Sequence, residues 1–321
     1  METISFLQGL GDWLLPVMYF FTSLGYESFY LVVMPLFYWC IDSLIGARLA
    51  LMLILTGSVN EILKLTFHAP RPFWVSPDVK VSHPETNFAF PSGHAQNAAS
   101  IWGLLADSLG KRWGWFLAAL VAFLIGASRL YLGVHFPRDV LAGWLVGALL
   151  LWLFIRLEAP IGDWIKRQPR WMQFAVSAAV SAAIMLLGNL VLWGLADWNI
   201  PQTWIQNAAH RDAPTPDPLS RDGITTLAGL FFGLAVGLIL VSAKGGFSAR
   251  GPLAKRAIRY ILGMVGVLIL WAGLKAIFPS GQELLPQILR YVRYALTGFW
   301  VTGLAPMAFR ALKLASPSKQ T

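Results

Sequence analysis

Charged residues are scarce in this chain of 321 residues. Asp, Glu, Lys and Arg make up 13% of it, about half the share found in an ordinary soluble domain. Hydrophobic residues make up 56%, and several apolar runs approach the roughly 20 residues with which a helix crosses a bilayer. Lipid offers no partner to backbone N–H and C=O groups, so such runs form helices. The sequence therefore predicts an all-α fold, a polytopic transmembrane helical bundle.

Cysteine is almost absent as well. Cys40 is the only one, which excludes an internal disulfide and a cysteine-based metal site. The five histidines and the acidic residues form no metal-binding pattern, so no metal and no other cofactor is expected. The start of the chain also lacks a basic segment, since Glu2 follows Met1, and no cleavable signal peptide is expected.

The hydrophobic pattern predicts about nine membrane spans. An apolar stretch at residues 3–24 precedes them and is broken by Gly, Asp and Pro. It predicts an interfacial helix, with a short extra span as the alternative. The predicted spans are residues 26–46, 49–67, 92–109, 113–131, 139–157, 172–195, 223–242, 257–278 and 294–312.

The net charge of +9 indicates membrane topology rather than nucleic-acid binding, because the basic residues lie in short loops between apolar runs. Fifteen of the 25 Lys and Arg residues lie in one set of alternate loops, seven lie in the other set, and three belong to the motifs described below. The larger set is Arg48, Lys111, Arg112, Arg156, Lys166, Arg167, Arg170, Lys244, Arg250, Lys255, Arg256, Arg259, Arg310, Lys313 and Lys319. Positive loops stay in the cytoplasm, so the motif segments 64–94 and 129–139 are expected on the extracytoplasmic side of an inner or plasma membrane.

Two modules are expected. Residues 1–157 hold every motif and the N-terminal interfacial helix, and residues 158–321 add transmembrane helices of unknown role. A polar, Pro-rich loop is predicted at about residues 196–222. Glycines at every fourth position from Gly229 to Gly237 favour close helix packing, with a lipid-binding groove as the alternative.

Two short segments suit the binding of an anion. Lys64 is followed by Arg71 on the next loop, and a point charge beside a bidentate guanidinium holds a tetrahedral oxyanion well. Farther on, Ser92, Gly93 and His94 open a predicted helix, whose free N–H groups and dipole favour an anion. His94 is then placed to protonate a leaving oxygen. Each segment alone also fits a bland interpretation: a lysine anchor at the membrane surface and a capped helix with an incidental histidine.

A third segment adds a candidate nucleophile. Arg129 ends one predicted span, His135 follows in the loop, and Asp139 opens the next span. A carboxylate four residues after a histidine can hold one ring N–H and leave the other nitrogen free to attack; a structural His–Asp pair is the alternative. Asn60 lies one helical turn before Lys64 and is expected to orient it, unless it makes ordinary interhelical hydrogen bonds.

Together the three segments resemble the signature of the type 2 phosphatidic acid phosphatase (PAP2) superfamily, membrane enzymes related to soluble vanadium-dependent haloperoxidases. The resemblance covers roughly residues 26–157, and the N-outside arrangement of nine spans is similar to the glucose-6-phosphatase branch. The signature reads Lys-x6-Arg-Pro, Pro-Ser-Gly-His and Ser-Arg-x5-His-x3-Asp. Its positions are Lys64, Arg71, Pro72, Pro91, Ser92, Gly93, His94, Ser128, Arg129, His135 and Asp139.

The resemblance implies a haloperoxidase-like catalytic core and a role for each residue. His135 is expected to form a phosphohistidine, Asp139 to orient its ring, and His94 to act as general acid and then base. The phosphate-binding set it implies is Lys64, Arg71, Ser92, Gly93 and Arg129. We therefore expect a metal-independent phosphatase that acts on a lipid phosphate or diphosphate, such as polyprenyl diphosphate or phosphatidate. A sugar-phosphate phosphatase, a lipid phosphotransferase and a lipid transporter or flippase are the alternatives.

Overall fold

The computed structural model describes residues 1–317, all of whose regular elements are helices. Lys319, which was counted in the charge pattern, lies outside the described residues. The chain divides into two compact units, and three long helices pass from one unit to the other along the sequence. Unit 1 comprises Met1–Tyr30, Leu55–Arg156 and Gly188–Ser220; unit 2 comprises Leu31–Ile54, Leu157–Leu187 and Arg221–Thr321. The predicted boundary at residue 157 stays a prediction.

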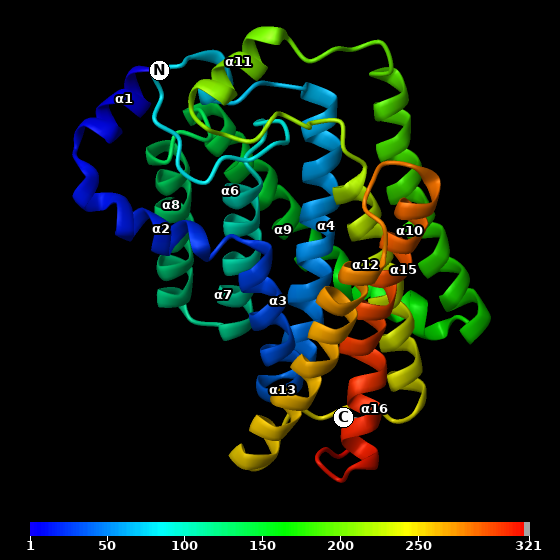
Figure 1. Cartoon of the computed structure of the whole chain (residues 1–321). Coiled ribbons are helices and arrows are strands. Elements are labelled where there is room, and N and C mark those ends of the chain that lie inside the picture. The colour runs from blue at the N-terminus through cyan, green and yellow to red at the C-terminus, as the bar shows by residue number, and fades with distance from the viewer. Residues whose placement is uncertain (318–321) are drawn as a thin grey trace. The chain divides into compact units, whose positions relative to one another are not determined.

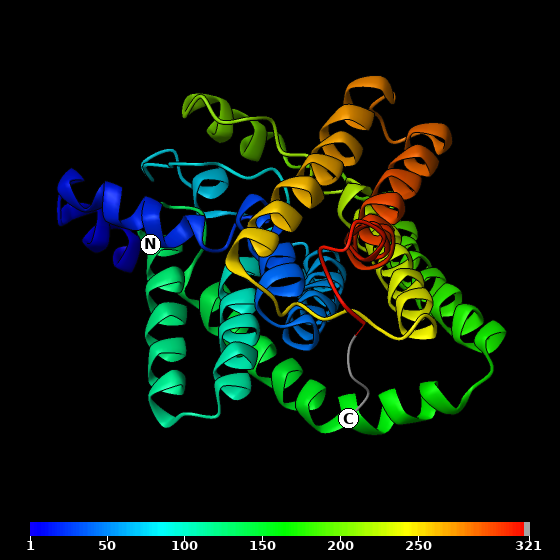
Figure 2. The same cartoon turned by 90° about the horizontal axis from the view of Figure 1, so that it is seen from below.

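Unit 1 holds all of the motif residues. Helices α2 and α7 both pack against α8, and α6 with α7 runs beside α8 in Figures 1 and 2. The unit contains α1 (Glu2–Gly9), α2 (Leu15–Ser23), the later part of α4 (Ser43–Phe67), α5 (Pro72–Val75), α6 (Gly93–Asn97), α7 (Gly103–Leu109), α8 (Arg112–Tyr131), most of α9 (Pro137–Arg167), the end of α10 (Arg170–Gly194) and α11 (Gln202–His210).

Unit 2 is built around the contact of α12 with α15, which lie side by side in Figures 1 and 2. The predicted close packing at the glycine stripe is confirmed, because a Cβ at Gly233 would stand 1.8 Å from the Ala295 carbonyl oxygen. The helices are the later part of α3 (Glu27–Leu36), which begins in unit 1, the start of α4, the remaining parts of α9 and α10, α12 (Asp222–Ala243), α13 (Leu253–Leu268), α14 (Leu274–Ile277), α15 (Leu284–Phe299) and α16 (Ala305–Ala311).

Six helices of the described chain are long and apolar enough to cross a membrane, which makes this an integral membrane protein. A seventh span arises if the bent pair at Glu2–Ser23 counts as one. Four predicted spans fall on helices interrupted by π-turns: 26–46 at Phe37–Ile41, 92–109 at Ala98–Trp102, 257–278 at Ile269–Gly273 and 294–312 at Trp300–Leu304. The count of nine stays a prediction.

The predicted boundary between the first two spans was wrong. It was expected between residues 46 and 49, whereas the helices are separated at Asp42, whose backbone is extended. The Asp42 carboxylate accepts hydrogen bonds from the backbone N–H groups of Leu44 and Ile45 at 2.8 and 3.0 Å. This carboxylate caps the first turn of α4, and α4 therefore begins earlier than the hydrophobic pattern suggested.

The N-terminal stretch is also not a single helix. Helix α1 and the segment from Asp12 to Ser23 are bent by 86° relative to each other. Helix α2 packs against α8 and brings Thr22 to the motif residues, as described below.

Glycines on α9 let that helix approach the start of α6 closely. A Cβ at Gly143 would lie 2.6 Å from the Ser92 carbonyl oxygen, and one at Gly147 would lie 2.4 Å from the Gln96 carbonyl oxygen. The backbone N–H of Ser92 also donates to the carbonyl of Asp139 at 2.9 Å. The start of α9 and the start of α6 are thus held together through their backbones.

The substitution Gly143→Ala is expected to lower the thermal stability of the detergent-solubilised protein. The added methyl group meets backbone rather than a movable side chain, and such overpacking costs about 1–3 kcal/mol. Gly162→Ala, on the same helix, is the matched control because nothing lies within 4 Å of its Cβ position; there alanine stabilises by about 0.5–1 kcal/mol. Thermal unfolding followed by fluorescence measures both, and equal shifts for the two variants would contradict the prediction.

Candidate active site

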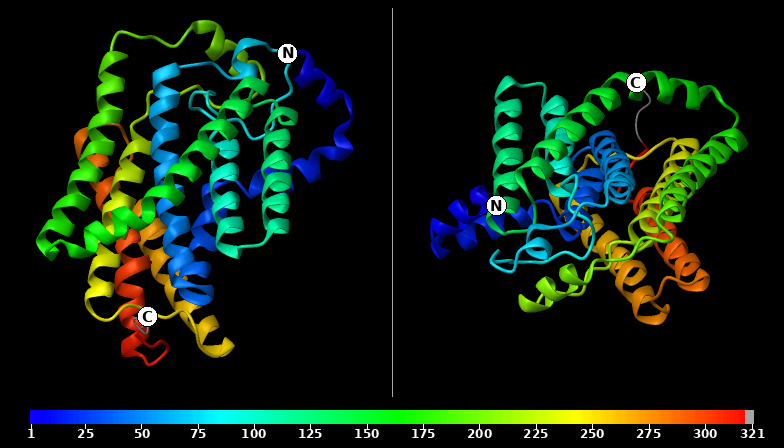
Figure 3. Two further views of the ribbon diagram at one scale, coloured as in Figure 1. Left: turned by 180° about the vertical axis from the view of Figure 1, so that it is seen from behind. Right: turned by 90° about the horizontal axis from the view of Figure 1, so that it is seen from above.

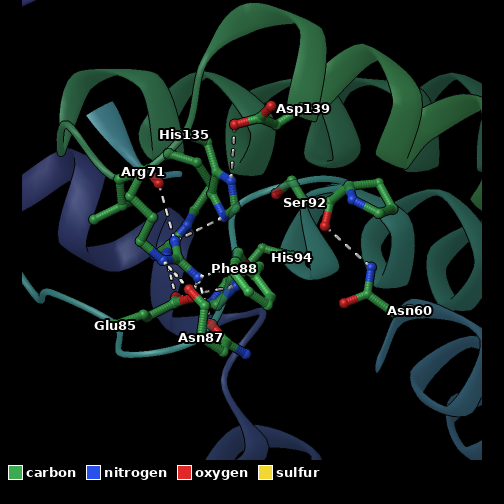
Figure 4. Close-up of polar contacts among 12 residues, drawn as sticks. Asn60, Arg71, Glu85, Asn87, Phe88, Ser92, His94, His135 and Asp139 are labelled. Carbon is green, nitrogen blue, oxygen red and sulfur yellow. Dashed lines mark hydrogen bonds and ion pairs between the residues drawn. The ribbon is translucent and has the colours of Figure 1, made fainter. Parts of the chain in front are cut away.

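The three motif segments, which are far apart in the sequence, meet within unit 1 (Figure 4). Lys64 stands on the last turn of α4 and is 5% exposed. The second and third segments contribute helix ends: the start of α6, the last turn of α8 and the first turn of α9. Arg71 and His135 lie in the connections between helices. Each motif residue is therefore placed by a helix end or by a short connection beside one.

Arg71 is fully buried, and every nitrogen of its guanidinium has a partner. Its Nε donates to the Asn87 carbonyl at 2.7 Å, and Nη1 donates to the Val134 carbonyl at 2.9 Å. Nη2 donates to three oxygens, those of the Glu85 carboxylate at 2.6 Å, the Asn87 side chain at 2.5 Å and the Phe88 carbonyl at 3.2 Å. Segment 85–88 therefore fixes where the guanidinium points.

Arg129 reaches the same place from α8. It is fully buried, donates through Nη1 to the Thr22 hydroxyl at 2.5 Å, and pairs through Nη2 with Glu85. The carboxylate of Glu85 thus bridges the two arginines, and its Oε1 also lies 3.8 Å from His94 Nδ1. Figure 4 shows Glu85 beside Arg71, below the His135 ring.

The Glu85 carboxylate is ionised at neutral pH. Burial alone would raise the pKa of its carboxyl, but Arg71 and Arg129 outweigh that effect and hold the pKa well below its usual range. The Glu85 carboxylate therefore neutralises part of the positive charge that Arg71 and Arg129 bring to the site.

His135 lies with one ring nitrogen toward Asp139 and the other toward Arg71 (Figure 4). Nδ1 is 3.5 Å from Asp139 Oδ2, an ion-pair distance, and Nε2 is 3.4 Å from Arg71 Nη1. Asp139 Oδ2 also accepts the backbone N–H of Phe136 at 2.8 Å. Burial first and Arg71 second lower the pKa of His135 well below its usual range, so the ring is neutral at neutral pH, and its Nε2 accepts a hydrogen bond from Arg71 Nη1.

Ser92 caps α6, because its side chain accepts the Ala95 N–H at 3.4 Å. Asn60 supports this turn: its amide donates to the Pro91 carbonyl at 3.2 Å and to the Gln96 side chain at 2.9 Å. A Cβ at Gly93 would lie 2.8 Å from the Asn60 side-chain oxygen. The Asn60 amide therefore bonds to the start of α6 and makes the interhelical hydrogen bonds that were the alternative to orienting Lys64.

His94 lies against the segment that follows α2. Its ring makes an edge-to-face contact with Tyr26 at 5.1 Å, and a Cβ at Gly25 would stand 2.4 Å from it. Within residues 1–317, its Nε2 is buried without a hydrogen-bond partner. Nδ1 faces Glu85, so the two nitrogens of His94 have different surroundings.

Glu85, Asn87 and Thr22 were not predicted from the sequence as site residues. A signal for Glu85 existed, since three cations, Lys64, Arg71 and Arg129, were expected in one site with a single carboxylate, Asp139, among the predicted site residues to balance them. Thr22 gave no such signal because it meets Arg129 only through the packing of α2 on α8. In the described part of the chain, no group of three or more His, Cys, Asp and Glu side chains is arranged to hold a metal ion.

Comparison with known proteins places these residues in a family. The sequence matches the PAP2 superfamily over residues 45–162, the range that contains every motif residue. It also matches the PAP2 superfamily phosphatase transmembrane extension over residues 225–317. The intervening residues, 163–224, lie outside both matches.

Individual relatives agree with this assignment. Phosphatidylglycerophosphatase B from Bacillus subtilis is 36% identical over 162 residues, which cover 44% of this chain and 73% of that protein. Undecaprenyl-diphosphatase from Sulfolobus acidocaldarius is 33% identical over 36% of this chain and 56% of its own length. Sphingosine-1-phosphate phosphatase 1 from Mus musculus is 26% identical over 92% of this chain and 72% of its own length. The chain belongs to the PAP2 superfamily of membrane phosphatases.

Proposed function

We propose that this protein hydrolyses a lipid phosphate or diphosphate through a phosphohistidine intermediate. The observation that carries the proposal is the convergence of two fully buried arginines, Arg71 and Arg129, on Glu85, with Arg71 Nη1 3.4 Å from His135 Nε2. Two guanidinium groups neutralise the equatorial oxygens of a phosphoryl group, and phosphoryl transfer depends mainly on such positioning and neutralisation. The nucleophile stands at the edge of this anion site.

In the proposed reaction the phosphoryl group is transferred to His135 and then to water. His135 Nε2 attacks phosphorus, the bond from phosphorus to the leaving oxygen breaks, and His94 gives its proton to that oxygen. His94 then takes a proton from water while the water oxygen attacks phosphorus; the bond from phosphorus to His135 Nε2 breaks, inorganic phosphate leaves and both histidines are restored. Asp139 stabilises the positive charge on the His135 ring, while Lys64, Ser92 and the Gly93 N–H help to bind the phosphoryl oxygens.

Lipid substrates are favoured by the setting of the site and by the relatives. Lys64, Arg129 and Asp139 stand near the ends of helices that are apolar enough to span a membrane, where we expect the headgroups of lipids to lie. The names of three relatives denote phosphatases for undecaprenyl diphosphate, phosphatidylglycerophosphate and sphingosine 1-phosphate. The asymmetry of the basic loops favours an extracytoplasmic site in an inner or plasma membrane.

Phosphate release from a panel of substrates tests the proposal. The purified protein in detergent micelles is given phosphatidate, a polyprenyl diphosphate, phosphatidylglycerophosphate, sphingosine 1-phosphate and glucose 6-phosphate. We expect kcat/KM to be at least about 10-fold higher for the best lipid than for glucose 6-phosphate, because uniform binding of the apolar chain adds to kcat/KM. Hydrolysis is expected to persist in a chelator and to stop with orthovanadate, which mimics five-coordinate phosphorus.

Three outcomes would contradict this proposal. A preference for glucose 6-phosphate would assign the site to a sugar phosphate. Transfer of the phosphoryl group to a lipid acceptor, with less than one free phosphate per substrate consumed, would make the protein a transferase. Binding of lipid phosphates without any release of phosphate would favour a transporter.

A further inference from the structure

Residues 196–220 form a segment that the motifs do not explain. They lie outside both family matches, 45–162 and 225–317, yet they belong to unit 1 together with the active-site residues. The segment contains α11, which lies at the same end of unit 1 as the loop of residues 68–92 in Figures 1 and 3. It was expected only as a polar, Pro-rich loop.

One part of this segment packs on α5. Trp204 is stacked on Trp74, with ring centroids 5.5 Å apart and ring planes inclined by 27°. Asn207 donates from its side-chain amide to the Trp74 carbonyl at 2.9 Å. Trp74 is fully buried, so these contacts are part of what covers it. Helix α5 begins at Pro72, directly after Arg71, and the backbone of Arg71 is therefore tied to the segment through three residues.

Other parts of the segment touch the loop that holds the side chain of Arg71. The backbone N–H of Asp217 donates to the Thr86 carbonyl at 3.0 Å. The Trp198 ring packs edge-to-face on Phe88 at 5.5 Å. Thr86 and Phe88 belong to segment 85–88, which supplies four of the five oxygens bonded to the Arg71 guanidinium.

Residues 196–220 therefore contact both elements that fix Arg71: helix α5, which follows its backbone, and segment 85–88, which binds its guanidinium. We propose that this segment positions Arg71 for phosphate binding, with Trp204 and Asn207 as its main positioning residues. Neither residue touches the phosphate site itself; both act through α5. The expected changes in kcat and KM rest on the proposed hydrolase function. The expected change in anion binding rests only on the position of Arg71.

Trp204→Ala and Asn207→Ala are the test variants, and each has a matched control. Trp193→Ala removes a tryptophan that is 79% exposed, and Gln206→Ala removes an exposed amide from the same helix as Asn207. Trp204→Phe keeps an aromatic ring against Trp74 and serves as the conservative variant. Orthovanadate is the probe, with its Kd measured from the rise in thermal midpoint that it produces.

We expect Trp204→Ala and Asn207→Ala to weaken vanadate binding and to lower kcat by about 5- to 20-fold, with a smaller change in KM. The loss falls mainly on kcat because a displaced guanidinium binds the transition state less well. Trp204→Phe is expected to recover most of the loss, and both control variants to match the parent. In an Arg71→Lys background, Trp204→Ala is expected to have little further effect on vanadate binding, since the two substitutions disturb the same group.

Several results would overturn the proposal. They include parent-like vanadate Kd and kcat in Trp204→Ala, an equal loss in Trp193→Ala, and an undiminished effect of Trp204→Ala in the Arg71→Lys background. A parent that binds vanadate but releases no phosphate would reject the hydrolase function, while the vanadate Kd values would still decide the role of the segment. The two proposals therefore fail independently.

Discussion

Replacing His135 with alanine is expected to abolish phosphate release from every substrate in the panel. Nε2 of His135 lies 3.4 Å from Arg71 Nη1 at the anion site, and in the proposed mechanism it is the atom that attacks phosphorus. Loss of a nucleophile that acts together with its acid–base partner costs at least about 10³-fold in kcat. The measurement is steady-state phosphate release at matched concentrations of folded protein.

Labelling of the protein separates loss of the nucleophile from general damage. The parent, given a radiolabelled substrate and quenched rapidly, is expected to carry an acid-labile phosphate, and His135→Ala to carry none. His94→Asn is expected to keep the label for longer, because the base that activates water is missing. His210→Ala is the control, since His210 is an exposed histidine at the end of α11. Parent-like phosphate release by His135→Ala would refute the assignment of the nucleophile.

Much of the site could be predicted because its residues stand at helix ends that the hydrophobic pattern locates. Lys64, Arg129 and Asp139 each lie within a turn of an end of an apolar run, and apolar runs that alternate in direction return such ends to a shared membrane surface. Ser92 and Gly93 predict a helix start, because both residue types are favoured at the N-terminal cap of a helix. Local rules therefore place the motif segments near one another without knowledge of the packing.

The parts that escaped prediction depend on contacts between distant segments. In the sequence Glu85 is an ordinary loop residue; its role follows only from its contacts with Arg71 and Arg129 in the structure. In the sequence Trp204 lies in a predicted polar loop, and its stacking on Trp74 is visible only in the structure. The helix boundary at Asp42 was missed for a different reason. The cap depends on one side chain, and the apolar residues on both sides of Asp42 made the hydrophobic run look continuous.

Replacing Glu85 with glutamine is expected to lower both stability and activity. The amide has nearly the size of the carboxylate but no charge, so two buried guanidinium groups lose the anion that neutralises them. Removing one partner from a buried ion pair costs about 3 kcal/mol or more. Arg71 and Arg129 then repel each other and leave their positions around the phosphate, and we expect kcat/KM to fall by about 10²-fold. Thermal unfolding and phosphate release in detergent measure the two effects.

The stability loss is expected to depend on pH in a direction set by Glu85 itself. Arg71 and Arg129 hold the pKa of its carboxyl well below the ordinary value, which is about 4.3 in the unfolded chain. A depressed pKa stabilises the folded protein above the unfolded pKa, and this contribution is lost as the pH falls through the folded pKa. The gap in thermal midpoint between the parent and Glu85→Gln is therefore expected to be constant from about pH 7 to 5 and to narrow below about pH 4.

Asp78→Asn provides the control for this substitution, because Asp78 is an exposed carboxylate in the same loop. We expect it to match the parent in thermal midpoint at every pH and in phosphate release. A gap that widened as the pH fell from about 7 toward 4 would show that the folded protein raises the pKa of Glu85, contrary to its two arginine contacts. If Glu85→Gln matched the parent in both measurements, the carboxylate would be a bystander, and Arg71 and Arg129 would be held by Thr22, Asn87 and the backbone carbonyls alone.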